Sequence, residues 1–204
     1  MTGAERNNKS VAMKLWEKEY RFNRQVEDFT VGDDYILDQK LTKYDVLASI
    51  AHAKMLGKVG ILNKDEGQKL GTALNNIIEL DKQGKFKIVK EQEDCHTAIE
   101  NHLTKELGDL GKKIHTARSR NDQVLTALRL YYKEELSDCE ELVNGLIAAI
   151  KRFTGKYGKI ELPGYTHTRR AMPSSISMWG NAFIDSMQDN LKAVNFALEL
   201  DAHR

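Results

Sequence analysis

Residues 112–123 gather side chains suited to binding an anion. Five basic or titratable side chains lie close to Ser119 and Asn121, and they are Lys112, Lys113, His115, Arg118 and Arg120. Asn121 and Asp122 are good N-caps for the apolar pattern that follows, so we expect this loop at the N-terminus of a helix. The N-terminus of a helix, with arginine beside it, favours the binding of a carboxylate or phosphate. A solvated basic turn with an ordinary cap is equally compatible with this spacing.

Residues 162–171 (LPGYTHTRRA) hold a histidine just ahead of a second long apolar pattern. Pro163-Gly164 predicts a turn, and we interpret the segment as a loop. Thr166 offers a hydroxyl group, and His167 offers the side chain best suited to proton transfer near neutral pH. A purely structural histidine is the simpler alternative.

His96 and Glu100 lie four residues apart, so a helix would place them on one face, as it could two metal ligands. No third ligand is evident, and a simple side-chain interaction is the more frequent meaning of such a pair. We therefore predict no metal site and no cofactor.

The elements that must position these residues are helices. The pattern predicts an extended arm over 14–41, and then helices starting at Thr42, after the capping box of Asn63 and Glu66, and over 91–107. The residues expected to face the core are Val46, Leu47, Ile50, Ala53, Leu56, Leu70, Leu74, Ile77, Ile78, Ile99, Leu103 and Leu107.

Two much longer helices follow. The first apolar stripe runs from Asn121 for about 33 residues, or ~50 Å, with Gly145 interrupting it, and the second follows Pro173. Such helices cannot bury their stripes alone, so we expect an all-α fold with a bundle shared between subunits. We predict a small helical domain over 1–117 and the start of the bundle over 118–204. The second helix reaches the chain end, which suggests truncation.

Composition excludes several protein classes. The net charge is +1, from 31 basic and 30 acidic residues, so no global field recruits nucleic acid or anionic membrane. No apolar run is long enough to span a bilayer, and the polar first residues are no secretory signal. Cys95 and Cys139 have no metal-ligand spacing and make no disulfide framework. We expect a cytoplasmic protein.

With these residues the chain resembles the argininosuccinate lyase family of the fumarase/aspartase superfamily. The similarity lies in EDCHTAIENHLTKELGDLGKKIHTARSRNDQVLTALRLY (93–131) and LPGYTHTRRAMPSS (162–175), and more weakly in 14–22 and 45–56. HTARSRNDQV is highly specific. The resemblance implies an all-α small domain followed by a long-helix bundle, assembled as a homotetramer.

The resemblance also implies a reaction and a set of roles. The family splits argininosuccinate into arginine and fumarate by anti elimination, in which a base removes a proton next to a carboxylate and an acid protonates the leaving nitrogen. Fixed donors around that carboxylate would stabilise the developing charge. The implied roles are as follows: His167 as the catalytic acid or base, Ser119, Arg120 and Asn121 as the carboxylate loop, Thr166 as a further substrate contact, and His96 as a further active-site histidine.

The chain departs from the family in three ways. Residues 29–32 read FTVG, without the substrate-contacting serine of many relatives, and Arg169 and Met172 replace two glutamines near His167. The mobile loop that carries the catalytic serine would lie beyond Arg204. We therefore expect an incomplete, weakly active or inactive piece of the enzyme. The alternatives are a non-catalytic structural relative and a sister lyase that releases fumarate from another adduct.

Overall fold

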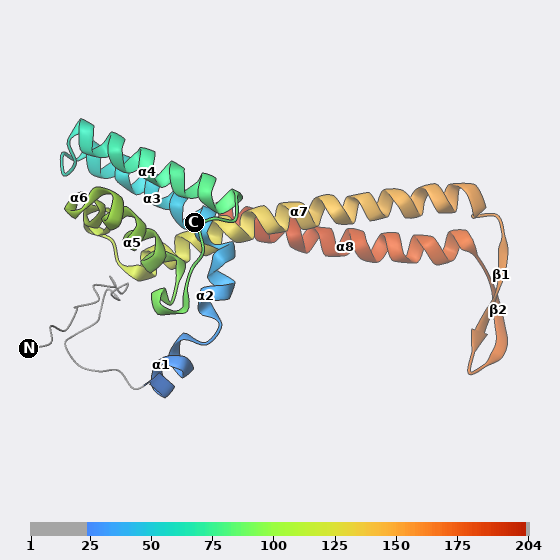
Figure 1. Ribbon diagram of the computed structural model, residues 1–204. Coiled ribbons are helices and arrows are strands. Elements are labelled where there is room, and N and C mark those ends of the chain that lie inside the picture. The colour runs from blue at the N-terminus through green and yellow to red at the C-terminus, as the bar shows by residue number, and fades with distance from the viewer. Residues whose placement is uncertain (1–23, 203–204) are drawn as a thin grey trace, which may run out of the picture. The chain divides into compact units, whose positions relative to one another are not determined.

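The computed structural model describes residues 24–202 and shows helices joined by short turns, with one two-stranded sheet (Figure 1). The predicted helical class is confirmed, with the sheet as an addition. In chain order the elements are α1 (Arg24–Val31), α2 (Asp34–Leu37), η1 (Asp38–Lys40), α3 (Thr42–Lys58), α4 (Lys64–Lys82), η2 (Lys90–Gln92), α5 (Cys95–Leu107), α6 (Asp109–Lys112), η3 (Lys113–His115), α7 (Arg120–Tyr157), β1 (Glu161–Thr166), β2 (Arg169–Ser175) and α8 (Ile176–Ala202).

The chain divides into two compact units, unit 1 (Met1–Leu128) and unit 2 (Arg129–Arg204). The extended arm predicted over 14–41 is wrong from Arg24 onward, because α1, α2 and η1 follow one another there. The first part of that arm and the weak family similarity at 14–22 lie outside the described residues. The predicted domains, 1–117 and 118–204, stay a prediction.

Unit 1 has a conventional hydrophobic core between α3, α4 and α5. Most of the apolar stripes predicted for these helices are buried there, and the fully buried members include Val46, Leu56, Leu70, Leu74, Ile77 and Leu103. Ile50, Ile78 and Leu107 are partly buried against the same core, and Leu47 is exposed, with 42% of its surface accessible. Each buried leucine or isoleucine side chain contributes roughly 1.5–3 kcal/mol through the hydrophobic effect, so this core holds the three helices together.

Local signals set the ends of these helices. The predicted capping box before α4 is confirmed. The backbone N–H of Asn63 donates to Glu66 Oε2 at 2.9 Å, and the backbone N–H of Glu66 donates to Asn63 Oδ1 at 2.9 Å. After α5 the chain turns back so tightly that a Cβ on Gly111 would lie 2.5 Å from the backbone carbonyl of Leu103. Only glycine fits at this position, so α6 can approach α5 closely.

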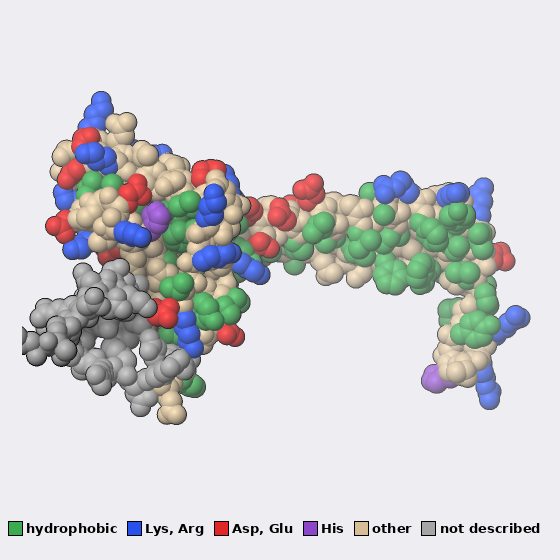
Figure 2. Space-filling model, in the orientation of Figure 1, with side chains coloured by type: hydrophobic (Ala, Val, Ile, Leu, Met, Phe, Trp, Pro, Cys, Tyr) green, Lys and Arg blue, Asp and Glu red, His purple; other side chains and the backbone are tan. Residues whose placement is uncertain are grey.

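Unit 2 consists of α7 beyond Leu128, the hairpin of β1 and β2, and α8. The long helix α7 has 38 residues, which confirms the predicted long helix, and it runs without a break through Gly145. Along part of their length α7 and α8 lie against each other (Figure 1): a Cβ on Gly180 would lie 2.3 Å from Thr154 Cγ2. The two helices bury little else, and Figure 2 shows hydrophobic side chains along their visible face.

Much of the apolar surface of α7 and α8 is therefore open to solvent. The most exposed large apolar side chains of these two helices are Leu142 at 75%, Met178 at 64%, Phe196 at 61%, Leu125 at 58% and Trp179 at 56%. Large exposed apolar surface is typical of faces that bind other molecules. Among the described residues, none of the helices is long and apolar enough to cross a membrane.

Candidate active site

The loop before α7 ends in a capping box built on Ser119. The Ser119 amide donates to Asp122 Oδ2 at 2.8 Å, and the Asp122 amide donates to Ser119 Oγ at 3.4 Å. The Ser119 backbone N–H lowers the pKa of the Asp122 carboxyl group. The prediction that Asn121 and Asp122 are N-caps is wrong, because α7 already begins at Arg120. The reciprocal bonds of Ser119 and Asp122 start the helix earlier.

Arg120 points to α5. Its Nη1 donates to Asp94 Oδ2 at 2.5 Å, and its Nη2 donates to Thr97 Oγ1 at 3.0 Å. Asp94 is also the N-cap of α5, because its Oδ1 accepts from the Thr97 amide at 2.8 Å. The guanidinium group thus ties the start of α7 to the start of α5, whereas the Ser119 and Asn121 side chains are exposed.

A second arginine holds the same loop to α3. The Nη2 of Arg118 donates to Ser49 Oγ at 3.0 Å, and burial lowers the pKa of this guanidinium group. Nearby, His52 Nε2 lies 3.0 Å from the Thr116 carbonyl oxygen. Sequence reasoning missed Ser49 and His52, because nothing in the pattern of α3 relates them to a loop more than 60 residues later.

His96 lies in the interior of unit 1. It is 2% exposed, and its Nδ1 lies 3.0 Å from Oδ2 of the fully buried Asp45 in α3. Glu100, which the spacing would place beside His96, pairs with His115. The structure therefore joins each member of the predicted helical pair to a different partner. Asp45 is a buried charged residue that sequence reasoning missed.

Thr166 and His167 lie at the tip of a β-hairpin in unit 2. The prediction of a loop over 162–171 is wrong: β1 pairs antiparallel with β2, and Thr166 opposes Arg169. His167 and Thr168 form the two-residue turn with φ of 50° and 65°, the backbone geometry of tight hairpin turns.

The side chains at this tip are exposed. Thr166 Oγ1 lies 2.9 Å from His167 Nδ1, so the neighbouring hydroxyl group orients the imidazole ring. A hydrogen bond at Nδ1 influences which tautomer the ring adopts and so which nitrogen is available for proton transfer. The chemical groups at this tip are thus the hydroxyl groups of Thr166 and Thr168, the imidazole of His167 and the guanidinium group of Arg169.

The sequence-predicted site residues fall into two groups. Ser119, Arg120 and Asn121 lie in unit 1, together with His96, whereas Thr166 and His167 lie in unit 2. Each group is held by contacts within its own unit. The unit 1 group offers hydroxyl, amide and backbone N–H donors at the start of α7, which can bind a carboxylate. The unit 2 group can hold or transfer a proton.

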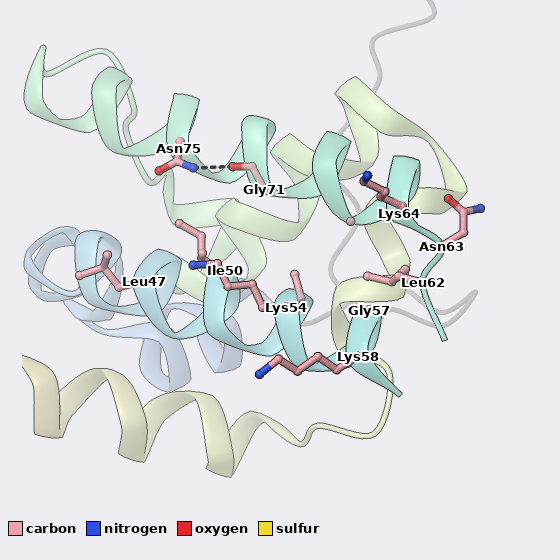
Figure 3. Close-up of a pocket in the computed structure, with 12 residues that line it drawn as sticks. Leu47, Ile50, Lys54, Gly57, Lys58, Leu62, Asn63, Lys64, Gly71 and Asn75 are labelled. Atoms are coloured by element: carbon pink, nitrogen blue, oxygen red, sulfur yellow. Dashed lines mark hydrogen bonds between the residues drawn. The ribbon is translucent and has the colours of Figure 1, made fainter. Parts of the chain in front are cut away.

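A groove of unit 1 lies away from these residues. The groove has a volume of about 680 Å³, lies along α3 and α4, and is lined by Lys54, Lys58 and Lys64 together with Gly57, Gly67 and Gly71 (Figure 3). Asn75 Nδ2 donates to the Gly71 carbonyl oxygen at 2.7 Å beside it. None of the predicted site residues lines this groove, so the site candidates rest on their chemistry and contacts and not on a cavity.

Comparisons with known proteins relate the whole described chain to one family. The profile of the family described as "Lyase" matches residues 9–202. The argininosuccinate lyase of Thermotoga neapolitana is 52% identical over 92% of this chain and 47% of its own length. That of Parabacteroides distasonis is 43% identical over 93% of this chain and 43% of its own length.

A solved structure has a similar fold. The solved structure described as fumarate lyase:delta crystallin from Brucella melitensis superposes with a TM-score of 0.70 at 19% identity, over 87% of this chain and 46% of that chain. The chain spans about half the length of the curated relatives it matches. The similarity to argininosuccinate lyases that the motifs predicted is confirmed. Because the family profile covers nearly the whole sequence, the chain belongs to the Lyase family.

Proposed function

We propose that this chain is the N-terminal part of an argininosuccinate lyase, which cleaves argininosuccinate to arginine and fumarate by anti elimination. The observation that carries the proposal is the 52% identity to the Thermotoga neapolitana argininosuccinate lyase over 187 residues. Identity at this level extends over the length that holds both the Ser119 loop and the His167 hairpin.

The geometry supports a division of roles. Ser119 and Asn121 are exposed at the positive end of a long helix, where they and the backbone N–H groups suit the substrate carboxylate whose charge develops in the reaction. His167 is the proton-transferring group, and Thr166 is a substrate contact that also orients the imidazole ring. Fumarate is the expected product of the carboxylate-bearing half.

Arg120 and His96, to which the resemblance also gives roles in the site, are bound by other residues of this chain. Arg120 is bound by Asp94 and Thr97, and His96 lies against Asp45. We infer that these two side chains support the start of α7 and the start of α5, and that the substrate contacts are left to their neighbours.

The proposal includes an oligomeric assembly. The exposed apolar faces of α7 and α8 suit a bundle shared between copies of the longer protein, and we propose a homotetramer in the cytoplasm. The purified 204-residue chain should form little or no fumarate, because it spans about half the length of its curated relatives.

The test uses the longer protein that contains this chain. Fumarate release from argininosuccinate, followed by ultraviolet absorbance, should require His167, so His167→Asn should abolish it. His102→Gln serves as the control, because His102 belongs to α5 and has no part in the proposed site. Activity with adenylosuccinate in place of argininosuccinate would identify a sister lyase. Absence of activity with both substrates would favour a non-catalytic structural relative.

A further inference from the structure

The groove along α3 and α4 is a feature of unit 1 that the proposed reaction does not use. Its volume of about 680 Å³ lies within the usual range of small-molecule sites, about 300–1,000 Å³. In Figure 3, Lys54 and Ile50 lie between the two helices. Because none of the residues assigned to the lyase reaction lines the groove, a ligand bound there would be additional to argininosuccinate.

Positive charge in this groove has no counterpart within it. The lining includes Lys54, Lys58 and Lys64, which we call the groove lysines, and no acidic side chain of the described residues lines it. Across residues 24–202 none of the groove lysines forms an ion pair with a carboxylate. Asp65 and Glu66, the acidic residues in the first turn of α4, pair with lysines outside the groove. Ammonium groups gathered in this way attract an anion with several charges.

The type of cation selects among anions. Arginine presents a planar fork that fits a carboxylate, whereas lysine is a compact point charge with three rotatable donors, which binds phosphate from any direction. Within the described residues no arginine lines the groove. A ligand with two or more phosphate groups can engage several of the groove lysines at once. The lining therefore favours an organic polyphosphate over a single carboxylate.

The groove also offers surface for the rest of such a ligand. Leu47, which the sequence pattern placed in the core, lines the groove with 42% of its surface exposed, and Ile50 is partly buried there. Asn75 Nδ2 donates to the Gly71 carbonyl oxygen, which leaves Asn75 Oδ1 to accept a hydrogen bond. Aliphatic surface with an amide acceptor suits a heterocyclic base, which combines a flat apolar face with N–H donors at its edge.

Three glycines keep the groove open. A Cβ on Gly57, Gly67 or Gly71 would meet no atom within 4 Å outside the adjoining backbone, so helix packing does not require glycine at these positions. Glycine stabilises a helix less than alanine does, so the open space is gained at the expense of helix stability. We propose that the groove binds an organic polyphosphate of nucleotide size, with its phosphate groups at the groove lysines and its base over Leu47 and Ile50.

Titration of the 204-residue chain with ATP tests the proposal. Isothermal titration calorimetry at physiological salt concentration, without added metal, should show one site of submillimolar affinity. Replacing Lys54 and Lys58 together (Lys54→Gln, Lys58→Gln) should weaken binding by about tenfold or more, because each loses a charged donor. Lys105→Gln is the matched control, because Lys105 is an exposed lysine of α5 outside the groove. No loss of affinity in the double variant, or an equal loss in Lys105→Gln, would overturn the proposal.

Two further measurements separate a fitted site from general attraction to positive charge. Inorganic tripolyphosphate has a similar charge but no base, so it should bind about tenfold more weakly than ATP, or weaker still. Gly71→Met should obstruct the groove and reduce ATP binding, whereas Thr72→Met, at an exposed position outside the groove, should not. Methionine favours a helix more than glycine does, and circular dichroism verifies that each variant is folded. Equal affinity for ATP and tripolyphosphate, or full ATP binding by folded Gly71→Met, contradicts the assignment whatever the lyase assay shows.

Discussion

The two units hold their candidate functional residues in different ways. In unit 1 the Ser119 loop is fixed by contacts between segments far apart in the sequence, Arg118 with Ser49 and Arg120 with Asp94. In unit 2 the hairpin tip is fixed by its own turn, and the contact that orients His167 comes from the residue beside it. The first arrangement depends on the packing of a whole core, and the second depends on local backbone geometry.

The cores differ in the same sense. Unit 1 buries a continuous cluster of apolar side chains, whereas the buried hydrophobic residues described in unit 2 are Ile147 and Ile184. The apolar core of unit 1 can therefore stabilise the segments that hold its candidate site residues. Unit 2 presents its candidate proton-transferring histidine on an exposed hairpin and leaves most of its apolar stripe exposed. The comparison predicts that equivalent substitutions have unequal effects in the two units.

The largest difference should come from leucine truncation. Leu74→Ala removes a fully buried side chain from the unit 1 core and should lower the free energy of unfolding by about 2–5 kcal/mol. Leu142→Ala, at a position 75% exposed in α7, should change it by no more than about 0.5 kcal/mol. Urea denaturation of the 204-residue chain measures both values. Equal effects would show that unit 2 has a core of its own.

Arginine truncation should give a smaller difference. Arg120→Ala removes two hydrogen bonds that join α7 to α5 and should lower the free energy of unfolding by about 1–2 kcal/mol, after allowance for the partial exposure of the pair. Arg169→Ala, on the exposed hairpin, should have an effect within about 0.5 kcal/mol. The same denaturation experiment compares them. If Arg169→Ala proves the more harmful, the hairpin is held by more than its turn.

The turn itself can be tested by relieving its geometry. Thr168 adopts a φ of 65°, which a β-branched residue disfavours. Thr168→Gly should therefore stabilise the hairpin by about 0.5–1 kcal/mol, the relief of strain exceeding the added flexibility of the unfolded chain. Hydrogen exchange at the β1 and β2 amides should become slower. Faster exchange would mean that the Thr168 side chain holds the turn.

The smallest effect concerns pH. Burial lowers the pKa of His52 below its usual 6.5, so the folded protein favours the neutral imidazole. This stabilisation is complete above pH 6.5 and is lost as the pH falls through the folded-state pKa. His52→Gln keeps a donor for the Thr116 carbonyl oxygen but cannot titrate. Stability should then fall less on acidification below pH 6.5 than in the wild type, and parallel curves would contradict this assignment.

Local sequence signals determined much of the fold. The apolar stripes of α3, α4 and α5 and the capping box at Asn63 follow from the 3.6-residue period and from side-chain bonding within one turn. The motif HTARSRNDQV was sufficient to predict the relation to argininosuccinate lyases. These features depend on residues close together in the chain, so one sequence is enough to recognise them.

Tertiary structure alone decided where the polar side chains point. Both Asn121 and Ser119 can cap a helix, and the bonds between Ser119 and Asp122 made the choice. Arg120 could face a ligand or the protein, and Asp94, 26 residues away, turned it toward α5. Asp45 of α3 lies against His96 of α5, and no periodicity encodes the relation of these two segments. Hydrophobic patterns are read along the chain, whereas the pairing of buried charges depends on which segments the core brings within a few ångströms of one another.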